Sequence, residues 1–214
     1  MSRVFDCADE HQRAAGVAAA AAAIRRGDLV VLPTDTVYGL AADAFSPDAV
    51  RRLLELKGRG RDVPVPVLIG SWRTVNGLVD ELPAAASDLI AAFWPGGLTL
   101  VLPMGTGLTW DLGDTLGTVA VRMPLHPVAL ELLAETGPLA VSSANRNGVP
   151  PAMSAAGAVE QLGDGVAVYL ESGSSPDLTS STIVDLTGPT PRLLRAGAVS
   201  VTDIEDVLGV TLDQ

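Results

Sequence analysis

Residues 118–145, with the sequence TVAVRMPLHPVALELLAETGPLAVSSAN, decide the fold class of this chain. Thr118–Met123 and Leu139–Ser142 are short apolar runs of the kind that form buried strands. Pro127–Glu135, which lies between them, is expected to be a helix. A strand, a helix and a second strand in this order predict an α/β layered fold.

The alternation of strands and helices continues on both sides of this segment, but it is not regular. We therefore expect one domain over residues 1–214, with a mixed sheet flanked by helices. Gly105–Gly117 is rich in Gly and Thr and is predicted to be a mobile hairpin or lid, and Glu171–Ser180 an exposed loop. Other predicted helices are Ala14–Arg26, Ser46–Gly58, Pro83–Phe93, Ser154–Leu162 and one opened by a Thr202–Glu205 capping box; other predicted strands are Leu29–Leu32, Val65–Ile69, Leu98–Leu102, Val166–Leu170 and Ser181–Leu186.

Composition limits the classes of function. The formal net charge of −11 disfavours tight non-specific binding to nucleic acid, so double-stranded RNA or tRNA binding is expected to be weak or absent. The single cysteine, Cys7, allows no disulfide within the chain and fits a reducing cytosol. No signal peptide or membrane segment is recognised, so the predicted location is cytoplasmic. Lys57 is the only lysine among 14 basic residues, either by chance or because an ammonium is needed there.

Several catalytic motifs are missing from the sequence. It lacks the P-loop pattern and a G-x-G-x-x-G after the first strand. With only His11, His126 and Cys7, it cannot build a Cys/His zinc site, and we predict no metal site in the protein. No G-x-S-x-G is present, which makes covalent hydrolase chemistry improbable. What remains are hydroxyls, glycines and isolated cations, which are suited to holding anions.

The strand at residues 118–122 carries an arginine among apolar residues. By the period of two, Thr118, Ala120 and Arg122 share one face. A buried guanidinium requires an anion, which is either a ligand carboxylate or phosphate or a protein carboxylate. The alternatives to a ligand site are a structural ion pair and a position at the end of the strand.

Two further segments place polar groups next to predicted elements. Thr34 and Thr36 face the same side if the chain remains extended there; a local turn with side-chain-to-backbone bonds is the alternative. Lys57–Arg61 sets three cations among two glycines after a helix. This arrangement suits phosphate, although it is also what a solvated helix cap looks like.

The C-terminal half adds three weaker signals. Ser142–Gly148 directly follows a strand, at the edge where open α/β sheets bind ligands, or it is an ordinary turn. Ser181–Asp185 contributes another pair of hydroxyls, and Leu194–Gly197 another cation beside a glycine. Each of these is weak by itself.

Taken together and in order, these segments resemble the YrdC/TsaC family of L-threonylcarbamoyl-AMP synthases. The matching segments span residues 33–197, and the end of the chain near residue 214 resembles the short form without the family's extra C-terminal domain. The segments are Pro33–Leu40 (PTDTVYGL), Lys57–Arg59 (K-x-R), Phe93–Thr99 (FWPGGLT), Val119–Pro124 (VAVRMP), Ser143–Asn145 (S-x-N), Ser181–Asp185 (STIVD) and Leu194–Gly197.

The resemblance implies a twisted α/β sheet around a deep, positively charged cavity. It also implies a reaction that joins L-threonine, bicarbonate and ATP into threonylcarbamoyl-AMP and pyrophosphate, with Mg²⁺ carried by ATP. In this family another enzyme system, the tRNA threonylcarbamoyl transferase complex, then modifies an adenosine beside the anticodon. That complex is therefore a candidate partner to which the product is handed over.

The resemblance also assigns roles to residues. Those expected to hold threonine are Thr36, Arg122 and Ser181. Those expected to hold ATP are Arg59, Thr118, Ser143, Asn145 and Arg195. Catalysis would consist of positioning and charge neutralisation, with Lys57 and Arg59 as its catalytic cations.

Four positions depart from the family pattern: Val63, Leu68, Pro151 and Ala196 stand where many relatives have Asn or Lys, His, Ser and Pro. They affect individual ligand contacts rather than the assignment. One competing hypothesis is an RNA-binding module without nucleotide turnover. Another is a carbamoyl-adenylate-forming relative from hydrogenase maturation, although those domains lie in much longer chains.

Overall fold

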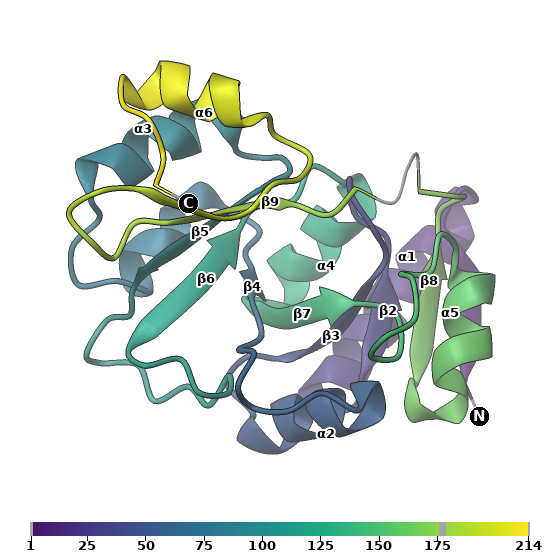
Figure 1. The fold of residues 1–214 in the computed structure, drawn as a ribbon. Coiled ribbons are helices and arrows are strands. Elements are labelled where there is room, and N and C mark those ends of the chain that lie inside the picture. Colours follow the sequence, from purple (N-terminus) through teal and green to yellow (C-terminus); the bar gives the residue numbers. More distant parts are fainter. Residues whose placement is uncertain (1, 176–178, 214) are drawn as a thin grey trace.

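The computed structural model describes residues 2–175 and 179–213, which contain a ten-stranded sheet (Figure 1). The predicted loop Glu171–Ser180 therefore lies partly outside the described residues. The strand order is β1-β8-β2-β3-β7-β4-β6-β5-β9-β10. The strands are β1 (Arg3–Asp6), β2 (Val30–Leu32), β3 (Gly39–Asp43), β4 (Val67–Leu68), β5 (Leu98–Pro103), β6 (Thr118–Arg122), β7 (Leu139–Ser143), β8 (Val168–Glu171), β9 (Thr182–Asp185) and β10 (Arg192–Arg195).

The sheet is mixed, as predicted. The pairs β1–β8, β2–β8, β4–β6 and β5–β9 are parallel, and the other neighbours are antiparallel. The irregular alternation in the sequence follows from this topology, because an antiparallel neighbour needs no crossover helix.

Helices connect the strands, and four of them (α1, α2, α5 and α6) begin at a residue whose side chain caps the helix. Ser46 and Ser154 accept hydrogen bonds from backbone N–H groups of α2 and α5, and Gly58 ends α2 in the left-handed conformation. No helix among the described residues is long and apolar enough to cross a bilayer. The helices are α1 (Glu10–Arg25), α2 (Pro47–Lys57), α3 (Ala84–Phe93), α4 (Pro127–Thr136), α5 (Ala155–Leu162) and α6 (Val201–Leu208), with the short 3₁₀ helices η1 (Trp72–Gly77) and η2 (Gly163–Gly165).

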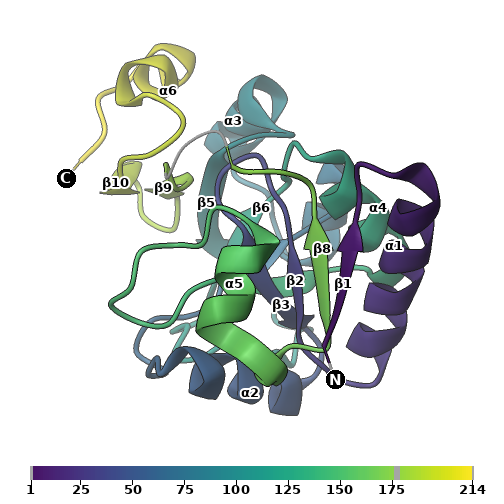
Figure 2. The same cartoon turned by 90° about the vertical axis from the view of Figure 1, so that its right-hand side faces the viewer.

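Two apolar clusters cover opposite faces of the sheet. Along β2, Val31 belongs to one cluster, whereas Val30 and Leu32 belong to the other, as the alternation of a strand requires. Helices α1 and α4 pack in the second cluster, and α2, α3, α5 and α6 contribute to the first. Figure 2 shows α1 on one side of β1, β8 and β2 and α5 on the other.

Some predicted elements need correction. Strand β3 was missed because four of the five residues of Gly39–Asp43 (GLAAD) have low strand propensity and the segment has no polar–apolar alternation. Strands β1 and β10 were missed because they are edge strands with mostly exposed side chains. The Thr202–Glu205 capping box is wrong: α6 begins at Val201, and Ser200 caps it by accepting a hydrogen bond from the backbone N–H of Asp203.

Candidate functional site: an arginine-lined cavity

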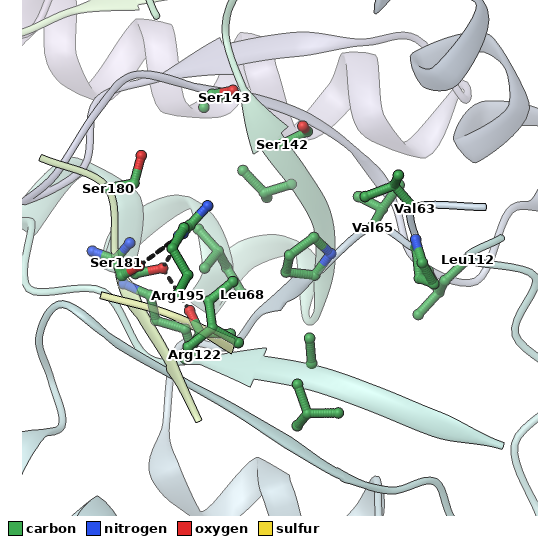
Figure 3. Close-up of a pocket in the computed structure, with 18 of the residues that line it drawn as sticks. Val63, Val65, Leu68, Leu112, Arg122, Ser142, Ser143, Ser180, Ser181 and Arg195 are labelled. Carbon is green, nitrogen blue, oxygen red and sulfur yellow. Dashed lines mark hydrogen bonds between the residues drawn. The ribbon is translucent and has the colours of Figure 1, made fainter. Parts of the chain in front are cut away.

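A cavity of about 400 Å³ lies against β6. Its walls come from the turn after β2, the segment leading into β4, the end of β7, and strands β5 and β9 (Figure 3). Among the described residues, its lining holds three arginines and several hydroxyl side chains but no carboxylate. These polar lining residues are Thr34, Thr36, Tyr38, Arg59, Thr99, Thr115, Thr118, Arg122, Ser142, Ser143, Ser180, Ser181 and Arg195.

The cavity has a polar end and an apolar end. Figure 3 shows Arg122, Arg195 and Ser181 gathered at one end, with Val63 and Leu112 at the other. The polar end therefore suits an anionic group and the apolar end an uncharged group. These two groups can belong to one ligand or to two different ligands.

Arg122 is buried at the end of β6 and is held by three protein groups. Its Nε donates to the carbonyl of Gly96 (2.9 Å), its Nη1 to Oγ1 of Thr36 (2.9 Å) and its Nη2 to Oδ1 of Asp35 (2.6 Å). Burial lowers the pKa of the Arg122 guanidinium, and Asp35 opposes that effect. The structure thus contains the structural ion pair that the sequence left open, and it also places Arg122 in the cavity wall on the same face as Thr118 and Ala120.

Thr34 and Thr36 form the local turn that was the alternative to an extended chain. Thr34 Oγ1 donates to the carbonyl of Val37 (2.7 Å) and accepts from the backbone N–H of Thr36 (3.2 Å). Since the single hydroxyl proton of Thr34 is used on Val37, Thr36 must be the donor in the 3.1 Å contact between the two hydroxyls. The oxygen of Thr36 therefore has a lone pair, but no proton, to offer a ligand.

Ser181 and Arg195 are tied directly together across β9 and β10. Arg195 Nη2 donates to Ser181 Oγ (3.0 Å), and its Nε and Nη2 both donate to the Ser181 carbonyl. Gly197 makes this approach possible, because a Cβ there would lie 2.2 Å from the carbonyl oxygen of Ser180. The Ser181 hydroxyl also contacts Thr99 Oγ1 at 2.8 Å.

Arg59 reaches the cavity from the loop after α2. Its Nη1 donates to Ser142 Oγ (3.2 Å), and burial lowers the pKa of its guanidinium. The pKa of Arg195 is lowered by burial and by repulsion from Arg122 and Arg59. Arg59 and Arg195, whose hydrogen-bond partners are uncharged oxygens, together form a site for an anion with more than one charge.

Lys57 and Asn145 lie beside the cavity rather than in its lining. The Lys57 ammonium donates to the carbonyls of Ser143 and Asn145 (2.7 Å for Asn145) and to Asn145 Oδ1 (3.4 Å). Asn145 Nδ2 in turn donates to the carbonyls of Arg146 and Val149. Burial, with a contribution from Arg59, lowers the pKa of Lys57 to about 8. The lysine therefore shapes the turn that presents Ser143 to the cavity.

The glycine-rich segment Gly105–Gly117 contributes Leu112 and Thr115 to the cavity lining. Arg61 holds it from the loop after α2, through ion pairs with Asp111 (2.6 Å) and Asp114 (3.4 Å). The carbonyl of Arg61 also accepts from the backbone N–H of Asp114 (2.8 Å). Arg61 is therefore not part of the cavity lining. Its contacts with Asp111 and Asp114 attach the predicted lid to the loop after α2.

The structure brings most of the predicted site residues together. Those in the lining are Thr36, Arg59, Thr118, Arg122, Ser143, Ser181 and Arg195, whereas Lys57 and Asn145 lie behind the Ser143 turn. Sequence reasoning gave Thr99 and Ser180 no role, although each lies within or beside a matching segment, whereas Ser142 belongs to the candidate turn Ser142–Gly148. Of the four departures from the family pattern, Val63 and Leu68 line the cavity.

Comparisons with known proteins place the chain in a family. A Sua5/YciO/YrdC family model, described as "Telomere recombination", matches residues 22–197, and the chain belongs to this family. A Mycobacterium tuberculosis protein, provisionally named threonylcarbamoyl-AMP synthase, is 60% identical over 210 residues, which cover 98% of this chain and 97% of that one. The threonylcarbamoyl-AMP synthase of Pyrococcus abyssi is 41% identical over 191 residues, which cover 89% of this chain and 56% of that protein.

Solved structures share the fold. The crystal structure of P. abyssi Sua5 complexed with L-threonine superposes with a TM-score of 0.92 at 37% identity, covering 100% of this chain and 62% of that one. Escherichia coli YciO has the same fold, with a TM-score of 0.84 at 22% identity over 95% of this chain and 100% of that one. The YrdC-like α/β fold predicted from the sequence is confirmed.

Proposed function

We propose that this protein is an L-threonylcarbamoyl-AMP synthase, which joins L-threonine, bicarbonate and ATP into threonylcarbamoyl-AMP and pyrophosphate. The observation that carries the proposal is the cavity with three arginines and a set of hydroxyls, in a chain that is 60% identical to a relative bearing that name. The competing RNA-binding hypothesis gains no support from a net charge of −11.

We assign the amino acid to the end of the cavity formed by Arg122, Thr36 and Ser181. The Arg122 guanidinium has five N–H groups, of which three are used within the protein, so two remain for a carboxylate. Thr36 presents an acceptor, which suits an N–H or O–H group of threonine rather than its carboxylate. The crystal structure of the P. abyssi relative complexed with L-threonine supports the presence of an amino-acid site in this fold.

We assign ATP to the side formed by Arg59, Arg195, Thr118 and Ser143. Arg59 and Arg195 supply two guanidinium groups whose protein partners are uncharged oxygens, so both can neutralise phosphate. In this arrangement Lys57 and Asn145 contribute through the Ser143 turn. No group of His, Cys, Asp and Glu suited to a metal is found among the described residues, and we propose that Mg²⁺ enters as the counterion of ATP.

The chemistry requires no protein nucleophile. The threonine amine and bicarbonate form a carbamate with loss of water; the carbamate oxygen then attacks the α-phosphorus, and pyrophosphate leaves. The protein holds the carbamate and the triphosphate in line and neutralises the charge that develops on the leaving group. Arg195 touches Ser181 directly, so the two substrates meet at this contact.

This proposal is tested by measuring pyrophosphate release from the purified protein. Release is expected only when L-threonine, bicarbonate and Mg·ATP are all present, and omission of any one abolishes it. Release that continues at the same rate without threonine contradicts the synthase assignment. We further propose that the protein works in the cytoplasm and hands its product to a tRNA threonylcarbamoyl transferase complex.

A further inference from the structure

Among the described residues, Asp35 is the carboxylate that forms an ion pair with an arginine of the cavity, yet it is not part of the cavity lining. Its Oδ1 accepts from Arg122 Nη2 (2.6 Å) and from the backbone N–H of Leu125 (2.9 Å). Its side chain is 16% exposed and that of Arg122 is 7% exposed, so the pair is largely withdrawn from water. Asp35 therefore binds the Arg122 guanidinium from outside the cavity lining.

The pairing divides the three arginines into two kinds. Arg122 and Asp35 together carry no net charge. Arg59 and Arg195 donate to hydroxyl and carbonyl oxygens, and among the described residues neither has a carboxylate within ion-pair distance, although Asp62 acts on Arg59 from farther away. The charge of the cavity is thus concentrated at Arg59 and Arg195, while the Arg122 end keeps hydrogen-bond donors without excess charge.

We propose that Asp35 is a positioning residue that sorts two anionic substrates between the ends of the cavity. By neutralising Arg122, it makes that end a poor site for a multiply charged phosphate chain. By holding the guanidinium in place, it keeps two N–H groups aimed at a singly charged carboxylate. The triphosphate is left to Arg59 and Arg195. This inference rests on the proposed function, because it concerns how the amino acid and the nucleotide are kept apart.

Asp35→Asn is the informative substitution, because both contacts of Asp35 use the same oxygen. The asparagine Oδ1 can still accept from Arg122 and from the Leu125 N–H, so the shape is retained while the charge is lost. Glu131→Gln is the matched control, because it removes the charge from another arginine–carboxylate pair, Arg13–Glu131, between α1 and α4. Circular dichroism and the melting temperature confirm that each variant folds.

The experiment measures L-threonine binding by calorimetry in the absence and presence of saturating inorganic pyrophosphate. In the wild-type protein and in Glu131→Gln, pyrophosphate is expected to leave threonine affinity unchanged within about twofold. In Asp35→Asn, pyrophosphate is expected to weaken threonine binding by about tenfold, because it now competes for an uncompensated Arg122. In turnover, the KM for threonine of this variant rises with ATP concentration, while kcat at saturating threonine is retained.

The proposal is overturned if pyrophosphate weakens threonine binding no more in Asp35→Asn than in the wild type. It is also overturned if the wild-type protein does not bind threonine. If Asp35→Asn does not fold, Asp35→Glu takes its place. Glutamate keeps the negative charge on a longer side chain. Threonine is then expected to bind more weakly, but pyrophosphate is not expected to compete with it. Competition in Asp35→Glu contradicts the charge argument. Wild-type protein that binds threonine but releases no pyrophosphate refutes the synthase assignment alone and leaves the binding comparison intact.

Discussion

The buried ammonium of Lys57 gives the fold a distinctive dependence on alkaline pH. The residue is 4% exposed, and the hydrogen-bond partners of its ammonium are oxygens of Ser143 and Asn145. Burial and the nearby Arg59 lower its pKa to about 8, against 10.5 for a solvated lysine. Lys57→Met removes this one titration, and no other lysine is present to obscure it.

The sign follows from counting protons. Below about pH 8 both the folded and the unfolded chain carry the Lys57 proton, so this residue adds no pH dependence. Between about 8 and 10.5 the folded chain has lost the proton and the unfolded chain keeps it, so the free energy of unfolding rises with pH. At about 1.4 kcal/mol per pH unit, this interval corresponds to about 3 kcal/mol.

The measurement is urea unfolding, followed by circular dichroism, of wild type and Lys57→Met at matched pH values across this interval. The difference in unfolding free energy between the two proteins is expected to grow in favour of the wild type by about 3 kcal/mol. Arg51→Met, on the exposed face of the same helix, is the control and should give a difference that is independent of pH. A difference for Lys57→Met that stays flat or falls as pH rises would refute the reasoning.

Three further predictions concern the cavity and its loop. Arg122→Ala is expected to weaken L-threonine binding by at least about tenfold, since it removes a charge-assisted contact; unchanged affinity in calorimetry contradicts the assigned role. Arg61→Ala releases Gly105–Gly117 from its ion pairs, so limited proteolysis in this segment should become faster, and saturating threonine and ATP should slow it in the wild type; equal cleavage in all samples argues against a lid. Gly197→Ala forces a Cβ onto the backbone of Ser180 and should lower stability by about 1–3 kcal/mol in urea unfolding, with loss of threonine binding; full retention of both shows that the close approach is dispensable.

Much of the fold could be predicted because its central elements have strong local signals. Helix α2 shows this best: Ser46, a proline at the first turn and Gly58 mark both ends, and the structure has caps at those positions. Strand β3 has no such signal, since Gly39–Asp43 is made a strand by pairing with β2 and β7 rather than by its own residues. The strand predicted at Val65–Ile69 is reduced to Val67–Leu68, because the N–H of Val65 is bonded to Leu112 instead.

Less of the site could be predicted, because the burial of a side chain and its hydrogen-bond partners depend on the tertiary structure. The period of two placed Thr118 and Arg122 correctly on one face, but it could not reveal that Asp35 lies behind Arg122. Lys57 stood out by composition, and only the fold shows that its ammonium faces backbone carbonyls instead of open cavity. Its assignment as a catalytic cation stays a prediction.

Because of the strand order, the cavity is complete only when nearly the whole chain has folded. The turn at Thr36, near the start, and Arg195, near the end, contact the same space only when β5 has paired with both β6 and β9. A nascent chain released early, or one whose last strands have detached, therefore has no anion site. Any ligand of the intact cavity shifts the equilibrium towards the fully assembled sheet by mass action. Bound substrate therefore stabilises the completely folded protein, and in particular the last two strands, β9 and β10, which contribute to the pocket wall.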